Sequence, residues 1–267
     1  MLRFLAIFFA CMLFFGAQGG EAEDAAPFSA RGDSNYPPYE FTDADGKPSG
    51  FNVEILKAAA EETGMDLNIS LGPWNQVRAE LENRKIDIIT GMYFSEERDA
   101  RVDFSVAHTM VSHAVFVREE NTGTDPLSDL AGMALIVQHG DIMHYYASEK
   151  QLGSSIHPVE TPQEAMFLLA SGIHDCALLP LRQGLYLIEK QGLENIIALE
   201  PPIMQSKYCF AVQNGEAALL NRLNEGLFAL KSKGRYRQIH DRWFGIYEEK
   251  NPWQTLKYWA AALAAAL

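Results

Sequence analysis

Residues 85–98 read KIDIITGMYFSEER, and this stretch decides the fold class. Its apolar run, residues 86–90, is short, rich in isoleucine and followed by glycine, which predicts a buried β-strand. In open α/β sheets, ligands bind beyond the carboxyl ends of the strands. The candidate ligand-binding residues at the end of this strand are Thr90, Gly91, Met92 and Tyr93.

On both sides of this stretch, strand-like and helix-like segments alternate. The predicted strands cover residues 28–31, 67–71, 134–137, 156–159, 176–179, 196–199 and 208–212. The predicted helices cover residues 53–63, 74–83, 141–150 and 216–233, one that starts with the cap sequence TPQE at residues 161–164, and one from Pro180 to Gly192. Alternation of this kind is typical of an α/β fold with mostly parallel sheets.

Two further strand ends carry candidate binding residues. Asp33 and Tyr36 follow the first predicted strand, and Gly140 and Asp141 follow the strand at residues 134–137. Since the carboxyl ends of parallel strands share one edge of a sheet, these residues are candidates for the same site as the residues after the central strand.

Composition excludes several functional classes. The chain of 267 residues carries 22 Lys and Arg against 35 Asp and Glu, a formal charge of −13, and it has no basic run. Binding to nucleic acid needs a surplus of basic residues, so no nucleic-acid partner is predicted. Three cysteines are too few for a disulfide-rich scaffold. The sequence shows no phosphate loop, dinucleotide fingerprint or nucleophile elbow, and no cofactor and no catalytic residue are predicted.

The two ends of the chain indicate export and a membrane. Arg3, the apolar residues 4–15 and the small residues after them predict a signal peptide over residues 1–19. At the other end, residues 253–267 begin with Trp and Tyr and continue as an apolar run, as at the start of a transmembrane helix. The alternative is a short Ala-rich helix packed on the domain. The predicted location is the periplasm, with a tether to the inner membrane through the C-terminal segment.

The ordered motifs of the chain resemble the bacterial periplasmic solute-binding proteins of family 3, the polar amino-acid binding type. The resemblance rests on YPPYEF at 36–41, GKPSGFNVE at 46–54, the stretch at 85–98, VDFS at 102–105, GRY at 234–236 and WFG at 243–245. It implies a two-lobed Venus flytrap with a mostly parallel sheet in each lobe, two crossing strands between the lobes and the ligand in the cleft. Lobe 1 would comprise residues 27–109 plus 209–248, and lobe 2 residues 110–208.

Within this family, the sequence is most similar to the sensor domains of membrane-bound histidine kinases and diguanylate cyclases. The sensor-like stretches are residues 32–39, 138–144 and 208–212. The resemblance therefore implies a receptor in which closure of the clamp is the signal, with a downstream signalling domain as partner. The alternative is a soluble binding protein of an amino-acid ABC transporter, whose partner is a permease.

The resemblance also implies roles for individual residues. Arg98 closes the central motif, where the family uses an arginine to hold a ligand carboxylate, a task that suits its planar charged fork. The alternative for Arg98 is a surface ion pair with a neighbouring acid. Tyr36 and Trp74 match the two positions that sandwich the ligand, although Trp74 could simply cover the core. Asp33 matches a position used for cationic ligand groups.

Three departures from the family pattern concern the ligand. Tyr93 stands where carriers have a small hydroxyl residue, and Asp141 stands where they have threonine. Pro180 replaces the acid that pairs with the ammonium group of an amino acid. The predicted ligand is therefore a small carboxylate-bearing solute that need not be an ordinary α-amino acid, unless Asp141 or Asp33 takes over the ammonium group.

The sequence gives weaker signs of two other kinds of chemistry. His139, Asp141 and His144 do not have the spacing of a metal site, so no metal is predicted. Some family members are dehydratases, which would need a carboxylic acid in the cleft. The prediction is non-catalytic binding, with a cyclohexadienyl or arogenate dehydratase as a third possibility. Cys176 and Cys209 lie in different predicted lobes, and the sequence leaves open whether they pair.

Overall fold

The structure is a computed structural model that describes residues 26–249. The predicted signal peptide at 1–19 and the predicted membrane segment at 253–267 lie outside the described residues. Within residues 26–249, none of the helices combines the length and the apolar character that crossing a membrane requires.

Ten of the described strands form a single sheet in the order β10-β9-β11-β8-β13-β6-β1-β5, with β12 added to β8 and β7 added to β13. Their bounds are β1 Phe28–Asp33, β5 Leu67–Gly72, β6 Ile88–Tyr93, β7 Val102–Phe104, β8 Thr109–Arg118, β9 Ala134–Gln138, β10 Ser155–Val159, β11 Cys176–Pro180, β12 Ile196–Ala198 and β13 Met204–Gln213. A separate small sheet follows β1 and contains β2 Asn35–Tyr36, β3 Glu40–Thr42 and β4 Pro48–Ser49.

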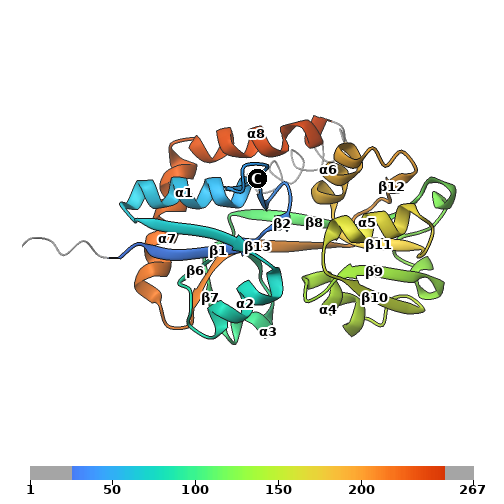
Figure 1. Ribbon diagram of the computed structural model, residues 1–267, viewed down its shortest axis with the longest axis horizontal. Helices are drawn as coiled ribbons and strands as arrows, with labels where there is room; N and C mark the ends of the chain where they lie inside the picture. Colours follow the sequence, from blue (N-terminus) through green and yellow to red (C-terminus); the bar gives the residue numbers. More distant parts are fainter. Residues whose placement is uncertain (1–25, 250–267) are drawn as a thin grey trace, which may run out of the picture.

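Helices cover both faces of this sheet in each half of the molecule (Figure 1). In the half that contains β1 and β6, which we call lobe 1, α1 Phe51–Thr63, α7 Ala217–Ser232 and α8 Arg235–Glu249 pack on one face, and α2 Trp74–Glu82 and α3 Glu96–Asp99 lie on the other. In the half that contains β9 and β11, which we call lobe 2, α5 Pro162–Ala170 and α6 Leu181–Gln191 pack on one face and α4 Ile142–Glu149 on the other. Two 3₁₀ turns, Glu119–Asn121 and Asp129–Gly132, precede β9.

Strands β8 and β13 connect the two lobes (Figure 1). Residues 109–113 of β8 pair antiparallel with residues 204–208 of β13. Beyond this ladder the strands diverge: β8 continues beside β11 and β12 in lobe 2, whereas β13 continues beside β6 and β7 in lobe 1. The sheets of both lobes are thereby joined through one pair of strands. The residue boundaries expected for the lobes fall near these strands and stay a prediction.

The predicted α/β fold is confirmed. Within lobe 1, β1 pairs in parallel with β5 and β6, and within lobe 2, β9 pairs in parallel with β10 and β11. The cap predicted from TPQE is also confirmed, because the Thr161 hydroxyl accepts a hydrogen bond from the Glu164 backbone N–H. The strand β8 was not predicted. Cys176 and Cys209 are buried, and both have free thiols.

Helices α1 and α7 pack closely because α7 carries a glycine at the contact. A Cβ atom on Gly226 would lie 2.4 Å from the backbone oxygen of Ala59 in α1. Backbone atoms cannot move aside as the end of a side chain can, so we expect Gly226→Ala to lower the free energy of unfolding by about 1–3 kcal/mol. Urea unfolding measures the change.

Gly245 in α8 provides the matched control for this substitution. Its Cβ would meet nothing within 4 Å. Gly245→Ala should therefore raise stability by about 0.5–1 kcal/mol, because alanine loses less backbone entropy in a helix. Equal effects of the two substitutions would contradict the close α1–α7 contact.

Candidate functional site

Residues from both lobes line one cavity that is partly open to solvent. Seven of the ten predicted binding residues line it: Asp33, Tyr36, Trp74, Gly91, Met92, Tyr93 and Asp141. Sequence reasoning missed the other three lining residues, which are Glu40, Gln138 and Tyr208. The remaining predicted residues, Thr90, Arg98 and Gly140, lie next to the lining residues without being among them. The structure thus brings the predicted strand ends together at one place.

Asp33, at the end of β1, connects the two lobes through its carboxylate. One oxygen accepts a hydrogen bond from the Asn35 backbone N–H at 2.8 Å, and the other accepts from the Gln138 side chain of lobe 2 at 3.1 Å. The Asp33 side chain is buried, and this burial raises its pKa to about 6 although both hydrogen bonds oppose the change. Asp33 therefore contacts the other lobe and the cavity at once.

Glu40 lies beside Asp33 and organises the lobe 1 side of the cavity. Its carboxylate accepts hydrogen bonds from the Asp33 backbone N–H at 2.8 Å, from the Asn52 amide at 2.9 Å and from the Thr90 hydroxyl. Thr90 therefore acts as a support for Glu40. Glu40 is completely buried, and burial raises its pKa to about 7 against the effect of these three donors.

Three tyrosine rings form the apolar part of the cavity. The Tyr93 ring is stacked on Tyr208 with centroids 4.3 Å apart, and it meets Tyr36 edge to face at 6.4 Å. The Tyr36 and Tyr93 hydroxyls lie 3.2 Å apart. Burial holds the pKa of all three phenols well above the ordinary value, so that they keep their protons and can donate hydrogen bonds.

Asp141 lies on the lobe 2 side of the cavity, at the N-terminus of α4. One carboxylate oxygen caps the helix by accepting from the Met143 backbone N–H at 3.0 Å, and the other accepts from the Tyr36 hydroxyl of lobe 1 at 3.4 Å. Burial raises the pKa of Asp141, and the hydrogen bond from Met143 and the charge of Arg98 oppose this shift. Asp141 is thus a second acid that joins the lobes.

Arg98 is buried and bonded to main-chain oxygens. Its guanidinium donates to the carbonyl oxygens of Tyr93 and Gly140, both at 3.1 Å. The same guanidinium lies over the rings of Trp74 and Tyr145, 5.6 and 5.9 Å from their centroids. Arg98 is 1 % exposed, so the surface ion pair considered for it is not what the structure shows. Its contact with a ligand carboxylate stays a prediction.

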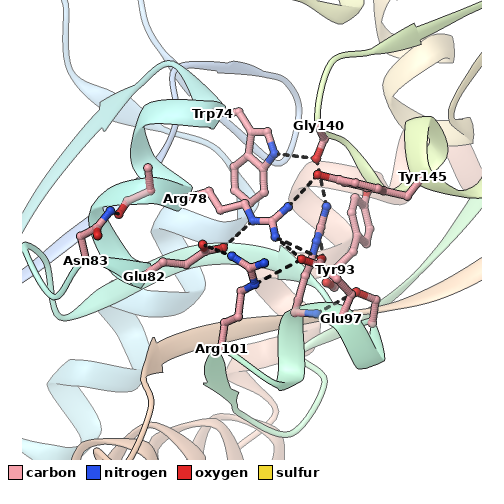
Figure 2. A network of polar contacts seen from close by, with 12 residues as sticks. Trp74, Arg78, Glu82, Asn83, Tyr93, Glu97, Arg101, Gly140 and Tyr145 are labelled. Atoms are coloured by element: carbon pink, nitrogen blue, oxygen red, sulfur yellow. Dashed lines mark hydrogen bonds and ion pairs between the residues drawn. The ribbon is translucent and has the colours of Figure 1, made fainter.

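The Gly140 carbonyl is the point at which side chains of lobe 1 bind to lobe 2. It accepts from both Arg98 and the Trp74 indole N–H, which lies 3.2 Å away (Figure 2). Glycine is favoured here, because the backbone has φ of 72° and a Cβ would lie 2.5 Å from the Asn75 side chain. Gly140 therefore acts through its backbone rather than by lining the cavity.

Arg78 in α2 extends the same contact towards the surface. It donates to the Tyr145 hydroxyl of lobe 2 at 3.1 Å and pairs with Glu82 and Glu97 in lobe 1 (Figure 2). Beside it, the Asn75 amide and the His139 ring are hydrogen-bonded at 2.9 Å. These bonds hold the two lobes of the clamp in direct contact.

Comparisons with known proteins agree with this architecture. The family model of bacterial extracellular solute-binding proteins, family 3, matches residues 30–246. The chain belongs to family 3. The family's extracellular description agrees with the predicted periplasmic location.

Individual relatives of this family 3 protein include a sensor domain and binding proteins. A histidine kinase sensor domain with similarity to periplasmic binding proteins is 37% identical, with a TM-score of 0.79 and coverage of 82% of this chain and 96% of that chain. The L-arginine-binding protein of Pseudomonas aeruginosa is 27% identical over 79% of this chain and 85% of its own length. The L-cystine-binding protein TcyJ of Escherichia coli is 24% identical over 80% of each chain.

Two expectations about chemistry concern residues around the cavity of this family 3 protein. Among residues 26–249, no three His, Cys, Asp or Glu side chains are grouped so that they could hold a metal ion. Pro180, expected from the resemblance to stand in place of an acid, caps α6 and is paired in register with His113 of β8, and it is not one of the lining residues.

His113 lies in the connecting strand β8, directly against the cavity tyrosines. Its ring is 4.9 Å from the Tyr93 ring, it is fully buried, and neither ring nitrogen has a hydrogen-bond partner. Burial lowers the pKa of His113 to about 3. The ring is therefore neutral in the folded protein at every physiological pH.

His113→Phe should make the protein less sensitive to acid. Below pH 6.5 His113 is protonated in the unfolded chain, whereas in the folded chain it stays neutral down to about pH 3. His113 therefore lowers the free energy of unfolding as the pH falls through this window. The free energy of unfolding of the variant, minus that of the wild type, should be about 2 kcal/mol larger at pH 5.0 than at pH 7.5. This follows from about 1.4 kcal/mol for each pH unit below 6.5. Urea unfolding at both pH values measures this, and a pH-independent difference would contradict it.

Proposed function

We propose that this chain is the periplasmic sensor domain of a transmembrane signalling protein, and that it clamps a small amine-bearing solute between its lobes. The observation that carries the proposal is the cavity itself, which takes lining residues from both lobes and three buried carboxyl groups from Asp33, Glu40 and Asp141. Carboxylates in a buried site interact strongly with an ammonium or guanidinium group.

Closure of the lobes is the proposed signal. The bonds from Asp33 to Gln138 and from Trp74 and Arg98 to Gly140 all cross from lobe 1 to lobe 2. A solute that binds only when both lobes contact it favours the closed population, and the connecting strands transmit the change. The relative with 37% identity is a sensor domain, which supports this role.

The alternative is a soluble binding protein that delivers an amino acid to an ABC permease. It is supported by relatives such as the L-arginine-binding protein, at 27% identity. A dehydratase would need substrate beside Asp33 or Asp141, and the relatives named above are binding proteins and a sensor domain. The sequence predicts a carboxylate on the solute, and this prediction depends on Arg98 as the partner of that carboxylate. In the structure, Arg98 donates to two backbone carbonyls.

A ligand screen and cell fractionation test the two parts of this proposal. We expect the melting temperature of the purified exported protein to rise with at least one member of a panel of amino acids and amines, because a ligand of the folded state stabilises it by mass action. A panel without any effect would contradict solute binding. We expect the protein to stay with the inner membrane after osmotic shock; release into the shock fluid would favour the carrier.

A further inference from the structure

His144 lies in the first turn of α4, and its side chain binds the backbone of Gly140. The Gly140 backbone N–H donates to the ring nitrogen Nδ1 of His144, with 3.2 Å between the two nitrogens. A backbone N–H can only donate, so Nδ1 must carry a lone pair and the proton of the ring must be on Nε2. An imidazolium has hydrogens on both nitrogens and cannot accept. This bond therefore exists only while His144 is neutral.

The turn at residues 138–141 carries the contacts of this part of lobe 2 with lobe 1. The Gln138 amide, the Gly140 carbonyl and the Asp141 carboxylate each bond to a lobe 1 side chain, and we call these bonds the turn contacts. Glycine has the widest backbone freedom of any residue. Gly140 is held on both sides, by His144 at its N–H and by lobe 1 at its carbonyl. Loss of the first bond leaves the carbonyl free to turn away from its donors.

The surroundings of His144 within lobe 2 disfavour its protonated form. The rings of His139 and Tyr145 lie 5.6 and 5.9 Å from the His144 ring. Partial burial and the charge of His139 lower the pKa of His144, and the charge of Asp141 opposes this shift. A positive charge in the first turn of a helix is also opposed by the helix dipole.

Lobe 1 presents two further cations to this end of α4. Arg98 donates to the Gly140 carbonyl, Arg78 donates to the Tyr145 hydroxyl, and Glu97 pairs with Arg78. The lobes bring these arginines to α4 only when the clamp is closed. A protonated imidazole in the first turn would then meet like charges, so protonation favours the open form.

We propose that His144 is a positioning residue of the clamp, and that only its neutral ring holds the Gly140 carbonyl within reach of lobe 1. Protonation changes Nδ1 from acceptor to donor, releases the Gly140 N–H and weakens the turn contacts. The closed form is therefore favoured at pH 7.5 and loses this support as the pH falls below about 6.5, the ordinary pKa of histidine. The consequence for solute affinity rests on the proposed function, whereas the effect on closure does not.

Nitrogen NMR on the purified exported protein, with no solute added, tests the bond itself. We expect the His144 ring to be the Nε2–H tautomer at pH 7.5. The Gly140 amide signal should shift with the same midpoint as the His144 ring when the pH is lowered. The Nδ1–H tautomer at pH 7.5, or a Gly140 amide that does not respond to this titration, would overturn the positioning role.

The distance between spin labels at Lys85 of lobe 1 and Lys150 of lobe 2, both exposed, tests the effect on closure. His144→Asn keeps an oxygen that can accept from Gly140, does not titrate, and has a similar helix propensity. From pH 7.5 to pH 5.5, the ratio of open to closed molecules should rise about threefold to tenfold more in the wild type than in His144→Asn. His144→Phe keeps a ring without an acceptor, and it should be more open than the wild type already at pH 7.5.

His157→Asn is the matched control. His157 lies in the edge strand β10, where its ring is stacked on that of His174. This variant should open with falling pH as the wild type does. Asp33 and Glu40, whose pKa values are raised to about 6 and about 7, also take up protons in this range. They do so in every variant, so the difference between the wild type and His144→Asn belongs to His144.

The outcomes separate this inference from the proposed function. Equal responses to pH in the wild type and His144→Asn would overturn the dependence of closure on a neutral His144. A wild type that does not open as the pH falls would overturn it as well. None of these measurements needs a solute, so a panel of amino acids and amines without any effect would contradict the proposed function alone.

Discussion

Replacing Arg98 by methionine should lower the free energy of unfolding by about 3 kcal/mol at pH 7.5. Methionine keeps an apolar stem between Trp74 and Tyr145 but removes the two hydrogen bonds to the Tyr93 and Gly140 carbonyls. Each hydrogen bond from a charged group contributes about 1.5–3 kcal/mol. The change also removes the positive charge that opposes the raised pKa of the buried Asp141.

The size of this loss should depend on pH. Without Arg98 the pKa of Asp141 rises further, so the variant should lose more stability at pH 7.5 than at pH 5.0, where Asp141 is closer to its neutral form. Urea unfolding at the two pH values measures this. Small-angle X-ray scattering should also show a larger radius, because the Gly140 bond that joins the lobes is lost.

Arg101→Met is the matched control. Arg101 belongs to the same lobe, is 58% exposed and pairs only with Glu82 and Glu97 among the described residues. Exposed ion pairs contribute about 0–1 kcal/mol, so the control should change stability little. A loss for Arg98→Met as small as that of the control would contradict the role of Arg98 in holding the lobes together.

Replacing Glu40 by leucine should be at least as damaging. The carboxylate accepts from the Asp33 backbone N–H, the Asn52 amide and the Thr90 hydroxyl, all of them buried. Leucine would leave three buried donors without an acceptor, and each costs about 1–3 kcal/mol. We expect a loss of roughly 3–9 kcal/mol, which corresponds to a melting temperature lower by about 6 °C or more for a chain of this size.

Calorimetric unfolding of Glu40→Leu and of a surface control checks this expectation. Glu61 is 62% exposed and pairs with Arg235 at the surface, so Glu61→Leu should cost less than about 1 kcal/mol. Solute binding should be lost in Glu40→Leu even at a temperature at which the protein is folded, because Asp33 loses its support. A variant at position 40 with normal stability and affinity would contradict this account of the site.

Local patterns were sufficient to predict most of the helices and strands. The isoleucine run before Gly91 became β6, and the cap at Thr161 starts α5 as predicted. The strand β8 was missed because it carries a histidine in its middle, where a sequence pattern gives no sign of burial. Burial of His113 depends on tyrosines that come from β6 and β13, far away in the sequence.

The site was predicted in outline, because strand ends in an α/β sheet converge on one edge. Glu40 was missed since an acid close to a turn has the appearance of a surface residue, and its three donors come from residues 33, 52 and 90. Arg98 was placed near the site, but its partners are the main-chain carbonyls of residues 93 and 140. Every residue has a main-chain carbonyl, whatever its side chain, so the sequence could not show which carbonyls bind Arg98.

The strands that connect the lobes determine how the clamp moves. Residues 109–113 and 204–208 pair as a continuous ladder and contain neither glycine nor proline. We therefore expect opening to twist this hydrogen-bonded ribbon rather than to bend at a loop. We expect substitutions at its exposed positions, such as Gln205 and Lys207, to change the affinity for a solute without touching the cavity.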